Sequence, residues 1–185
     1  MNKLLGIIIC VHLITIIYMY VLPDPDKVPY MFRHLVPKQF HDRLFKMSDD
    51  DRNAVKQIIA RHNEYKNINE ALNALKIIRP SLYNLSIEIK EYIDEKLSLL
   101  EPEAKKYITK RIDDYRKIRP TIEHKTTYSE INETLRHTIS DFIKLPESAK
   151  ESIRKTFPNI MQYVTSPKFK KLVKGMLDDI NYDDM

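Results

Sequence analysis

Apolar residues recur every three or four positions from residue 38 onward, and short polar or proline-containing breaks separate the runs. This spacing places the apolar side chains of each run on one face of a helix. One run, for example, carries Leu82, Leu85, Ile89 and Ile93. We find no convincing strand pattern, tandem repeat or low-complexity tract. The pattern therefore predicts an all-α fold.

Polar caps and prolines mark where these helices should begin. Ser48 precedes the acidic residues Asp49 to Asp51, which suit a first helical turn, and Asn69 is expected to cap the next helix. Proline is tolerated in a first turn because its missing N–H would have no partner there. Further helix starts are expected at Pro80, Pro102, Pro146, Pro158 and Pro167. Residues 121–127 are expected to form the longest loop.

The N-terminus has a different pattern from the rest of the chain. Met1-Asn2-Lys3 is a short basic start, residues 4–22 are almost continuously apolar, and Pro23 begins a polar break. This order is typical of a secretory signal peptide. No small residues precede the break, and the run approaches the roughly 20 residues that span a bilayer. We therefore favour a cleaved signal peptide and a secreted protein, with a retained signal-anchor in the membrane as the alternative.

The remaining chain is long enough for one domain with its own core. We expect an N-terminal segment at 23–37, a helical domain at 38–178 and a C-terminal tail at 179–185. The single cysteine, Cys10, lies inside the apolar leader, so no disulfide can help to hold this domain.

The charges argue against nucleic acid as a partner. The net charge is +5, and basic and acidic residues alternate along most of the chain, as in Arg111-Ile-Asp-Asp-Tyr-Arg116. Interleaved signs of this kind indicate a solvated helix surface. A nucleic-acid-binding protein would more often concentrate its basic residues on one face, together with aromatic residues.

The sequence also lacks the usual signatures of an enzyme or a metal site. The six histidines form no His-Glu-x-x-His motif, and there is neither a cysteine pair nor a Gly-x-Ser-x-Gly motif. His34 and His41 are interpreted as a surface pair, and His62 as a core histidine. Gly175 is the only glycine after the leader, which leaves no glycine-rich phosphate loop. We therefore expect no catalysis, no metal and no cofactor.

Short stretches between about residues 30 and 177 resemble the nematode fatty-acid- and retinol-binding family in their order and spacing. They are Leu35-Val36-Pro37, Met47-Ser48-Asp49-Asp50-Asp51, His62 with Tyr65-Lys66-Asn67, Glu70-Ala71-Leu72-Asn73-Ala74-Leu75-Lys76, Arg79-Pro80-Ser81-Leu82-Tyr83, Leu100-Glu101-Pro102-Glu103-Ala104-Lys105, Ala149-Lys150-Glu151, Phe157-Pro158 and Lys168-Phe169. The resemblance implies a single-domain, wedge-shaped bundle that encloses an apolar cavity for fatty acids and retinol. We expect about eight to eleven short and medium helices in it.

The apolar stripes then supply candidates for the cavity wall. The wall candidates are Ile58, Ile59, Leu72, Leu75, Leu85, Ile89, Ile93, Ile108, Ile112, Ile139, Phe142 and Ile143. Basic residues near these stripes are candidate contacts for a ligand headgroup, namely Arg61, Arg119 and Lys144. Because periodicity cannot distinguish a hollow core from a filled one, the alternative is a secreted or anchored helical protein-interaction module with a solid core.

Three features have two interpretations each. Residues 167–177 alternate apolar and lysine positions, which fits either a core-packing helix or transient contact with an anionic membrane. Asn84 and Asn132 begin N-x-[ST] sequons, which are either glycosylated or unoccupied. Ser48 with Asp51 resembles an acidic-directed kinase site, but we favour a helix N-cap. The sequence gives no basis for an oligomeric state.

Overall fold

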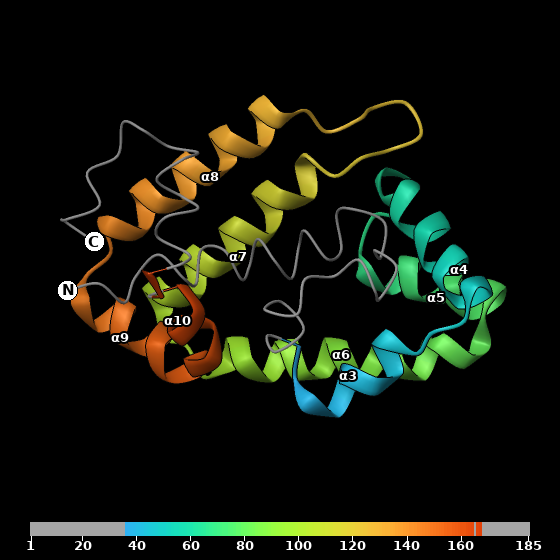
Figure 1. The fold of residues 1–185 in the computed structure, drawn as a ribbon, viewed down its shortest axis with the longest axis horizontal. Helices are drawn as coiled ribbons and strands as arrows, with labels where there is room; N and C mark the ends of the chain where they lie inside the picture. The colour runs from blue at the N-terminus through green and yellow to red at the C-terminus, as the bar shows by residue number, and fades with distance from the viewer. Residues whose placement is uncertain (1–35, 165, 168–185) are drawn as a thin grey trace. The chain divides into compact units, whose positions relative to one another are not determined.

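A computed structural model describes residues 36–164, 166 and 167 of the chain (Figure 1). These residues form α-helices and one short 3₁₀-helix, with no strand among them. The all-α fold class is therefore confirmed. The elements are α3 (Lys38–Phe45), α4 (Asp49–Ala60), η2 (His62–Glu64), α5 (Ile68–Ile78), α6 (Pro80–Ser98), α7 (Pro102–Lys117), α8 (Tyr128–Ile143), α9 (Glu147–Thr156) and α10 (Pro158–Val164).

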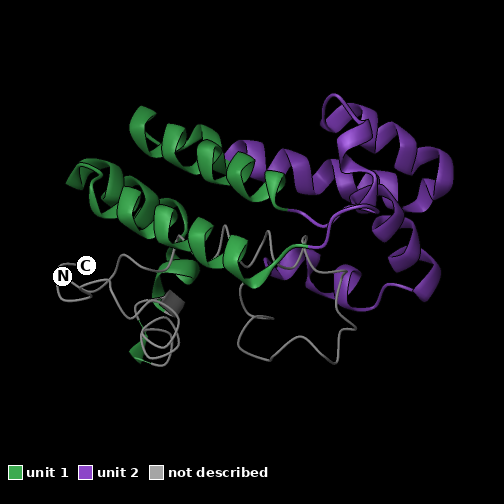
Figure 2. Cartoon of the chain, turned by 90° about the horizontal axis from the view of Figure 1, so that it is seen from above, with its two compact units in different colours: residues 1–15, 96–118, 126–185 green, residues 16–95, 119–125 purple. Residues whose placement is uncertain are grey.

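The chain divides into two compact units, which Figure 2 shows in different colours. Unit 2 contains α3, α4, η2, α5, residues of α6 up to Glu95, and the loop residues 119–125. Unit 1 contains α7 to α10 together with residues 96–101.

Two helices of unit 2, α4 and α5, begin where a side chain accepts from otherwise unpaired N–H groups. Ser48 caps α4, and its Oγ accepts a hydrogen bond from the Asp51 N–H at 3.2 Å. Asn67 caps α5, and its Oδ1 accepts from the N–H groups of Asn69 and Glu70. The predicted cap at Asn69 is therefore wrong by two residues, because Asn67 has the extended backbone of a cap and Asn69 already lies in the helix.

An apolar core holds unit 2 together. The buried side chains that form it are Phe40, Met47, Ala54, Leu75, Leu82 and Leu85. The rings of Phe40 and Tyr92 meet edge to face with centroids 5.5 Å apart, which joins α3 to α6. On the surface of the same unit, Arg43 Nη2 lies 2.6 Å from Glu88 Oε2.

In unit 1, α7 and α8 lie side by side and run antiparallel (Figure 1). Pro102 is the first residue of α7, as predicted, and α8 begins with a capping box between Thr127 and Glu130. Each of these two residues satisfies an N–H group of the other, which fixes the start of α8. The loop between α7 and α8 includes the predicted residues 121–127.

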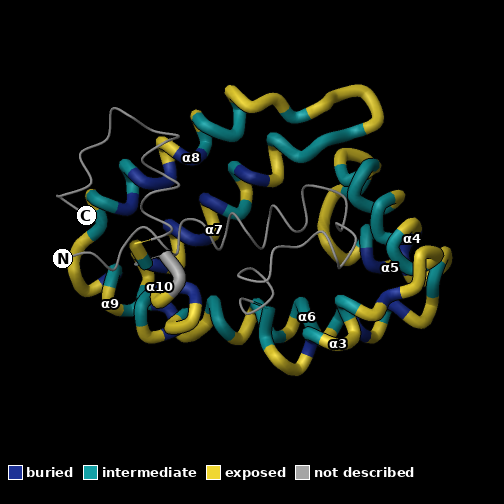
Figure 3. Tube along the Cα trace, viewed as in Figure 1, coloured by how far each residue is buried: buried dark blue, intermediate teal, exposed yellow. Residues whose placement is uncertain are grey.

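The core of unit 1 forms between α7, α8 and α9, whose buried positions Figure 3 shows in dark blue. Its largest fully buried apolar side chains are Tyr115, Phe142, Ile108, Ile139 and Ile153. The Ser152 hydroxyl accepts a hydrogen bond from the Glu101 N–H at 3.0 Å, which ties α9 to the start of α7.

Several predictions concern residues outside the described part of the chain. They are the leader at 1–22, most of the segment 23–37, nearly all of 167–177 and the tail at 179–185. The domain boundaries, the wedge shape and the enclosed cavity also stay predictions. Within 36–164, 166 and 167, none of the helices is long and apolar enough to cross a membrane.

The two asparagines at the start of α5 allow a matched test of the corrected cap. Asn67→Ala should lower the free energy of unfolding by about 1 kcal/mol, because two N–H groups lose their acceptor. Asn69→Ala should change it much less, since this side chain is exposed. Urea denaturation followed by circular dichroism measures both, and equal effects would contradict the assignment.

Candidate functional site

The structure places the predicted wall residues in two sets, one in each unit. Leu72, Leu75 and Leu85 are buried in unit 2, while Ile108, Ile139 and Phe142 are buried in unit 1. The other six are half-buried, with Ile58, Ile59, Ile89 and Ile93 in unit 2 and Ile112 and Ile143 in unit 1. All twelve thus lie at least partly inside a unit, but whether they line a cavity stays a prediction.

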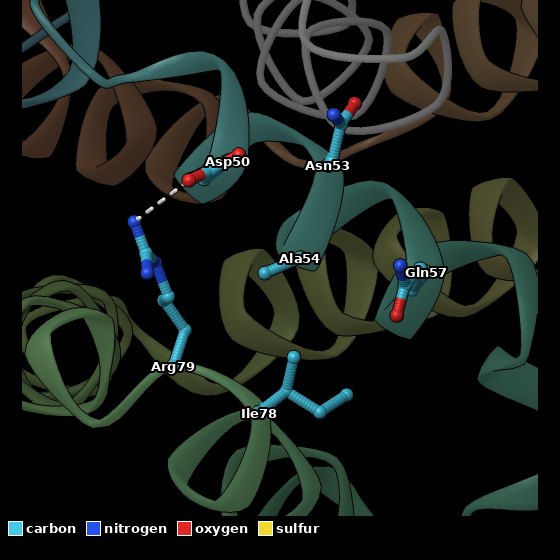
Figure 4. A pocket seen from close by; sticks show the side chains of 6 residues that line it. All are labelled: Asp50, Asn53, Ala54, Gln57, Ile78 and Arg79. Atoms are coloured by element: carbon cyan, nitrogen blue, oxygen red, sulfur yellow. Dashed lines mark ion pairs between the residues drawn. The ribbon is translucent and has the colours of Figure 1, made fainter.

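Unit 2 has a surface pocket of about 310 Å³ between α4 and the end of α5. It is lined by Asp50, Asn53, Ala54, Gln57, Ile78 and Arg79. Asp50 and Arg79 lie on one side and Gln57 on the other, with Ala54 and Ile78 between them (Figure 4). None of the predicted wall residues lines this pocket, and its mixed polar lining does not match a site for an apolar chain.

The same side of the pocket carries the ion pair between α4 and the residue that ends α5. Arg79 Nε lies 2.7 Å from Asp51 Oδ1, and Arg79 Nη2 lies 3.7 Å from Asp50 Oδ2. The hydrogen bond from Arg79 lowers the pKa of Asp51 below its usual value, against the opposing effect of burial. Asp51 is therefore ionised at neutral pH and joins the two helices.

The three predicted headgroup contacts have different surroundings. Arg61 is exposed and pairs with Glu64, whose Oε2 lies 2.9 Å from Arg61 Nη2. Lys144 is exposed directly after α8, and Arg119 is half-buried in the loop after α7. Their role as headgroup contacts stays a prediction.

The sequon asparagines differ in accessibility. Asn84 is exposed on α6, whereas Asn132 is half-buried on α8, and its enclosed Oδ1 has no hydrogen-bond partner among the described residues. Asn84 is therefore the more accessible of the two, and occupancy of both stays a prediction.

A buried arginine in unit 1 is the feature that the sequence interpretation missed. Arg111 was assigned to a solvated helix surface, but its side chain is 0% exposed. This assignment is wrong because Arg111 lies on the buried stripe of α7, in line with Ala104, Ile108 and Tyr115. The spacing of these four positions was the signal that could have revealed it, since each is three or four residues from the next.

Two tyrosine hydroxyls near Arg111 bond to Thr138, one to its backbone and one to its side chain. The Tyr107 hydroxyl donates to the Thr138 carbonyl oxygen at 3.0 Å. Thr138 Oγ1 donates to the Thr134 carbonyl oxygen, so it accepts from the Tyr115 hydroxyl at 3.1 Å. Burial raises the pKa of Tyr107 well above its usual value, although the charge of Arg111 opposes this. Tyr107 therefore stays protonated and able to donate.

Acidic and basic residues surround the guanidinium. Arg111 Nη2 lies 2.8 Å from Asp114 Oδ2 and 3.0 Å from Asp141 Oδ2. Lys110 and Lys117 also approach Asp114, at 2.9 and 3.7 Å. Burial acts to raise the pKa of Asp114, but the hydrogen bond from Lys110 and the charges of Arg111, Lys110 and Lys117 lower it overall. Asp114 thus stays ionised near neutral pH.

The hydrogen-bonding capacity of Arg111 is not used within the described residues. None of its three side-chain nitrogens has a hydrogen-bond partner of acceptable geometry there, although Nη2 is close to both carboxylates. A buried donor without an acceptor costs about 1–3 kcal/mol, and more when it is charged. The two carboxylates near Nη2 and the ring of Tyr107, with its centroid 5.6 Å from Arg111 Cζ, compensate part of this cost.

The histidines that lie in the described part of the chain support structural roles. His62 is half-buried in η2 and is not among the buried core residues, and its Nδ1 lies 3.0 Å from the Ile59 carbonyl oxygen. His41 is near Asp42 on α3. Among the residues that the structure describes, no three histidines, cysteines or acidic residues are grouped so that they could hold a metal ion.

The helical fold and the apolar stripes of the described residues define a class of small helical proteins. Comparison with known proteins then identifies the family. The family described as "Nematode fatty acid retinoid binding protein (Gp-FAR-1)" matches residues 30–176. This chain belongs to that family, as the sequence resemblance predicted.

Curated relatives match over most of the chain. "Fatty-acid and retinol-binding protein 1" of Onchocerca gutturosa is 27% identical over 171 residues, which are 92% of this chain and 96% of the relative. The protein of the same name from Onchocerca volvulus is 26% identical over the same shares. That of Litomosoides sigmodontis is 28% identical over 123 residues, which are 66% of this chain and 69% of the relative. No solved structure matches this chain.

The ion pair between Arg79 and Asp51 predicts a pH-dependent contribution to stability. The folded-state pKa of Asp51 is lowered, so its stabilisation is fully present above the unfolded-state pKa of about 4 and is lost as the pH falls through the folded-state pKa. Asp51→Asn should therefore lower the free energy of unfolding at pH 7, and this loss should shrink below about pH 4.

Asp50→Asn is the matched control, because Asp50 is exposed and more distant from Arg79. It should have a smaller effect at either pH. Urea denaturation of both variants at pH 7 and pH 3 measures the difference, and a loss for Asp51→Asn that does not depend on pH would contradict the role of this pair.

Proposed function

We propose that this protein is a carrier that binds long-chain fatty acids and retinol. The observation that carries the proposal is membership, over residues 30–176, of a family described as fatty acid retinoid binding. The names of the curated relatives support the same ligands. The apolar interiors of the two units are chemically suited to both ligands, because each ligand is mostly hydrocarbon.

The mechanism is reversible partition of an apolar chain from water into the interior of the protein, and no covalent bond is made or broken. Burying one CH₂ group contributes roughly 0.8 kcal/mol, so a chain of about sixteen carbons offers on the order of 12 kcal/mol before the costs of ordering. The half-buried wall candidates, such as Ile89 and Ile112, still expose apolar surface that a ligand can cover. Little polar recognition is then required.

The carrier is further proposed to act outside the cell. The basic start, apolar run and proline break within residues 1–25 support export through a signal peptide. The basic and apolar pattern of residues 167–177 supports transient contact with anionic membranes during ligand transfer.

Binding can be tested directly with a fluorescent fatty acid. Titration of delipidated protein should give saturable binding and a blue shift of the emission, and excess retinol or unlabelled fatty acid should reverse both. Material purified without delipidation should release fatty acids into an organic extract. A clean extract together with no saturable binding would contradict the proposal and would instead support an interaction module with a solid core.

Two isoleucines provide a matched comparison for the wall. Ile112→Ala should weaken fatty-acid binding about threefold to tenfold, because it removes part of an apolar surface predicted to contact the chain. Ile122→Ala should leave affinity unchanged, since Ile122 is 76% exposed in the loop after α7. Equal effects of the two substitutions in the same titration would show that Ile112 does not contact the bound chain.

Export predicts a defined N-terminus for the mature protein. Protein collected from the medium of a secreting eukaryotic host should begin close to residue 23, because a signal peptidase cuts near the end of the apolar run. N-terminal sequencing gives the answer. Protein that stays in the membrane fraction with Met1 intact would contradict cleavage and favour the signal-anchor.

A further inference from the structure

We propose that Arg111 binds the carboxylate of an apolar ligand, and that the ligand carboxylate takes the place of Asp141 at the guanidinium. This inference rests on the proposed lipid-binding function and assigns the charged end of the ligand to unit 1. Its basis is a fully buried guanidinium whose nitrogens lack hydrogen-bond partners within the described residues, on a stripe of otherwise apolar and aromatic side chains.

Among the described residues, the neighbouring polar groups leave N–H groups of Arg111 available to hydrogen-bond a ligand. The hydroxyls of Tyr107 and Tyr115 both bond to Thr138, and within the described residues the guanidinium donates to neither of them. Arg111 Nη2 is close to the two aspartates, but Nε and Nη1 have no described acceptor. A carboxylate is the acceptor that suits a guanidinium best, because it offers two oxygens to a fork of N–H groups.

The local charges favour an incoming anion. Arg111, Lys110 and Lys117 supply three positive charges, and Asp114 and Asp141 supply two negative charges, which leaves one positive charge. A ligand carboxylate therefore neutralises the cluster. Retinol carries a hydroxyl in place of a carboxylate, so it gains nothing from this charge.

The two aspartates differ in how readily they can leave the guanidinium. Asp114 also pairs with Lys110 and Lys117, and its side chain is 23% exposed. Asp141 has Arg111 as its only ion-pair partner in the described residues, and its side chain is 43% exposed. Asp141 can therefore turn into water at little cost, and a ligand carboxylate can replace it close to the surface.

The hydrocarbon chain of such a ligand would follow the apolar residues of the same helices. Ile108 and Ile112 flank Arg111 on α7, and Ile139, Phe142 and Ile143 lie near Asp141 on α8. Five of the predicted wall residues thus lie within one turn of this charged pair on the two helices. The predicted headgroup contacts Arg61, Arg119 and Lys144 are not part of this cluster.

Two substitutions with opposite expected effects test the exchange in the full-length protein. Arg111→Gln should weaken binding of a fluorescent fatty acid about tenfold or more, because charge-assisted hydrogen bonds are lost. Asp141→Asn should tighten it several-fold, because the competing carboxylate is removed. Arg116→Gln and Asp113→Asn are the matched controls, since these residues form an exposed pair on α7 and should leave affinity unchanged.

Matched ligands separate this inference from the proposed function. The methyl ester of the same fluorescent fatty acid and retinol should each bind all variants with equal affinity, whereas retinoic acid should follow the free fatty acid. Because loss of Arg111 leaves Asp114 and Asp141 without their buried cation, Arg111→Gln is interpreted only if its circular dichroism matches the native protein. Asp141→Asn tests the inference independently of that variant.

Two results would contradict this inference, and a third would contradict the proposed function. If Asp141→Asn binds every ligand as the native protein does, with no gain in affinity for the fatty acid, the proposed exchange is overturned. Equal losses for the acid and its ester in a folded Arg111→Gln variant would show a structural role for Arg111 only. Failure of the native protein to bind any of these ligands would instead overturn the proposed function.

Discussion

Burial of one apolar stripe per helix is the constraint on which both units depend. The only cysteine of the chain lies in the leader, so no covalent cross-link can support α3 to α10. The helices are short, and isolated helices of this length are only marginally stable in water. Each therefore needs its neighbours, and the buried side chains of unit 2 and of unit 1 form the contacts that make the helices stable.

This dependence makes a charged residue on a buried stripe costly. Arg111 occupies a position where an apolar side chain would stabilise unit 1 without any need for partners. Two aspartates and an aromatic ring offset the cost in part, and the remaining N–H groups stay without acceptors in the described residues. Stability alone therefore does not explain this arginine, and recognition of an anion, as proposed above, is the role that its chemistry favours.

Sequence reasoning predicted the fold class and most of the helix starts because these depend on local chemistry. Ser48, Pro80 and Pro102 act on backbone groups within one turn, so the chain shows their role directly. The burial of six of the twelve wall candidates was likewise predictable from the helical period.

Arg111 was missed although its spacing places it on the apolar stripe of α7, because an arginine is buried only where partners are near, and its partner Asp141 lies on α8. The cap of α5 was predicted at Asn69 but lies at Asn67. Either asparagine can cap a helix, and only the backbone conformation separates them. A cavity is harder still, since a filled and a hollow core have the same period.

The burial and hydrogen bonding of Tyr107 and Tyr115 affect the optical properties of the protein. The chain has eleven tyrosines and no tryptophan, so tyrosine dominates its ultraviolet absorption and emission. The rings of Tyr107 and Tyr115 are buried in unit 1, and their hydroxyls are hydrogen-bonded to Thr138, so both rings lie in an asymmetric environment. These two rings therefore contribute to the near-ultraviolet circular dichroism, and a change in that signal can follow the packing of unit 1 without any attached dye.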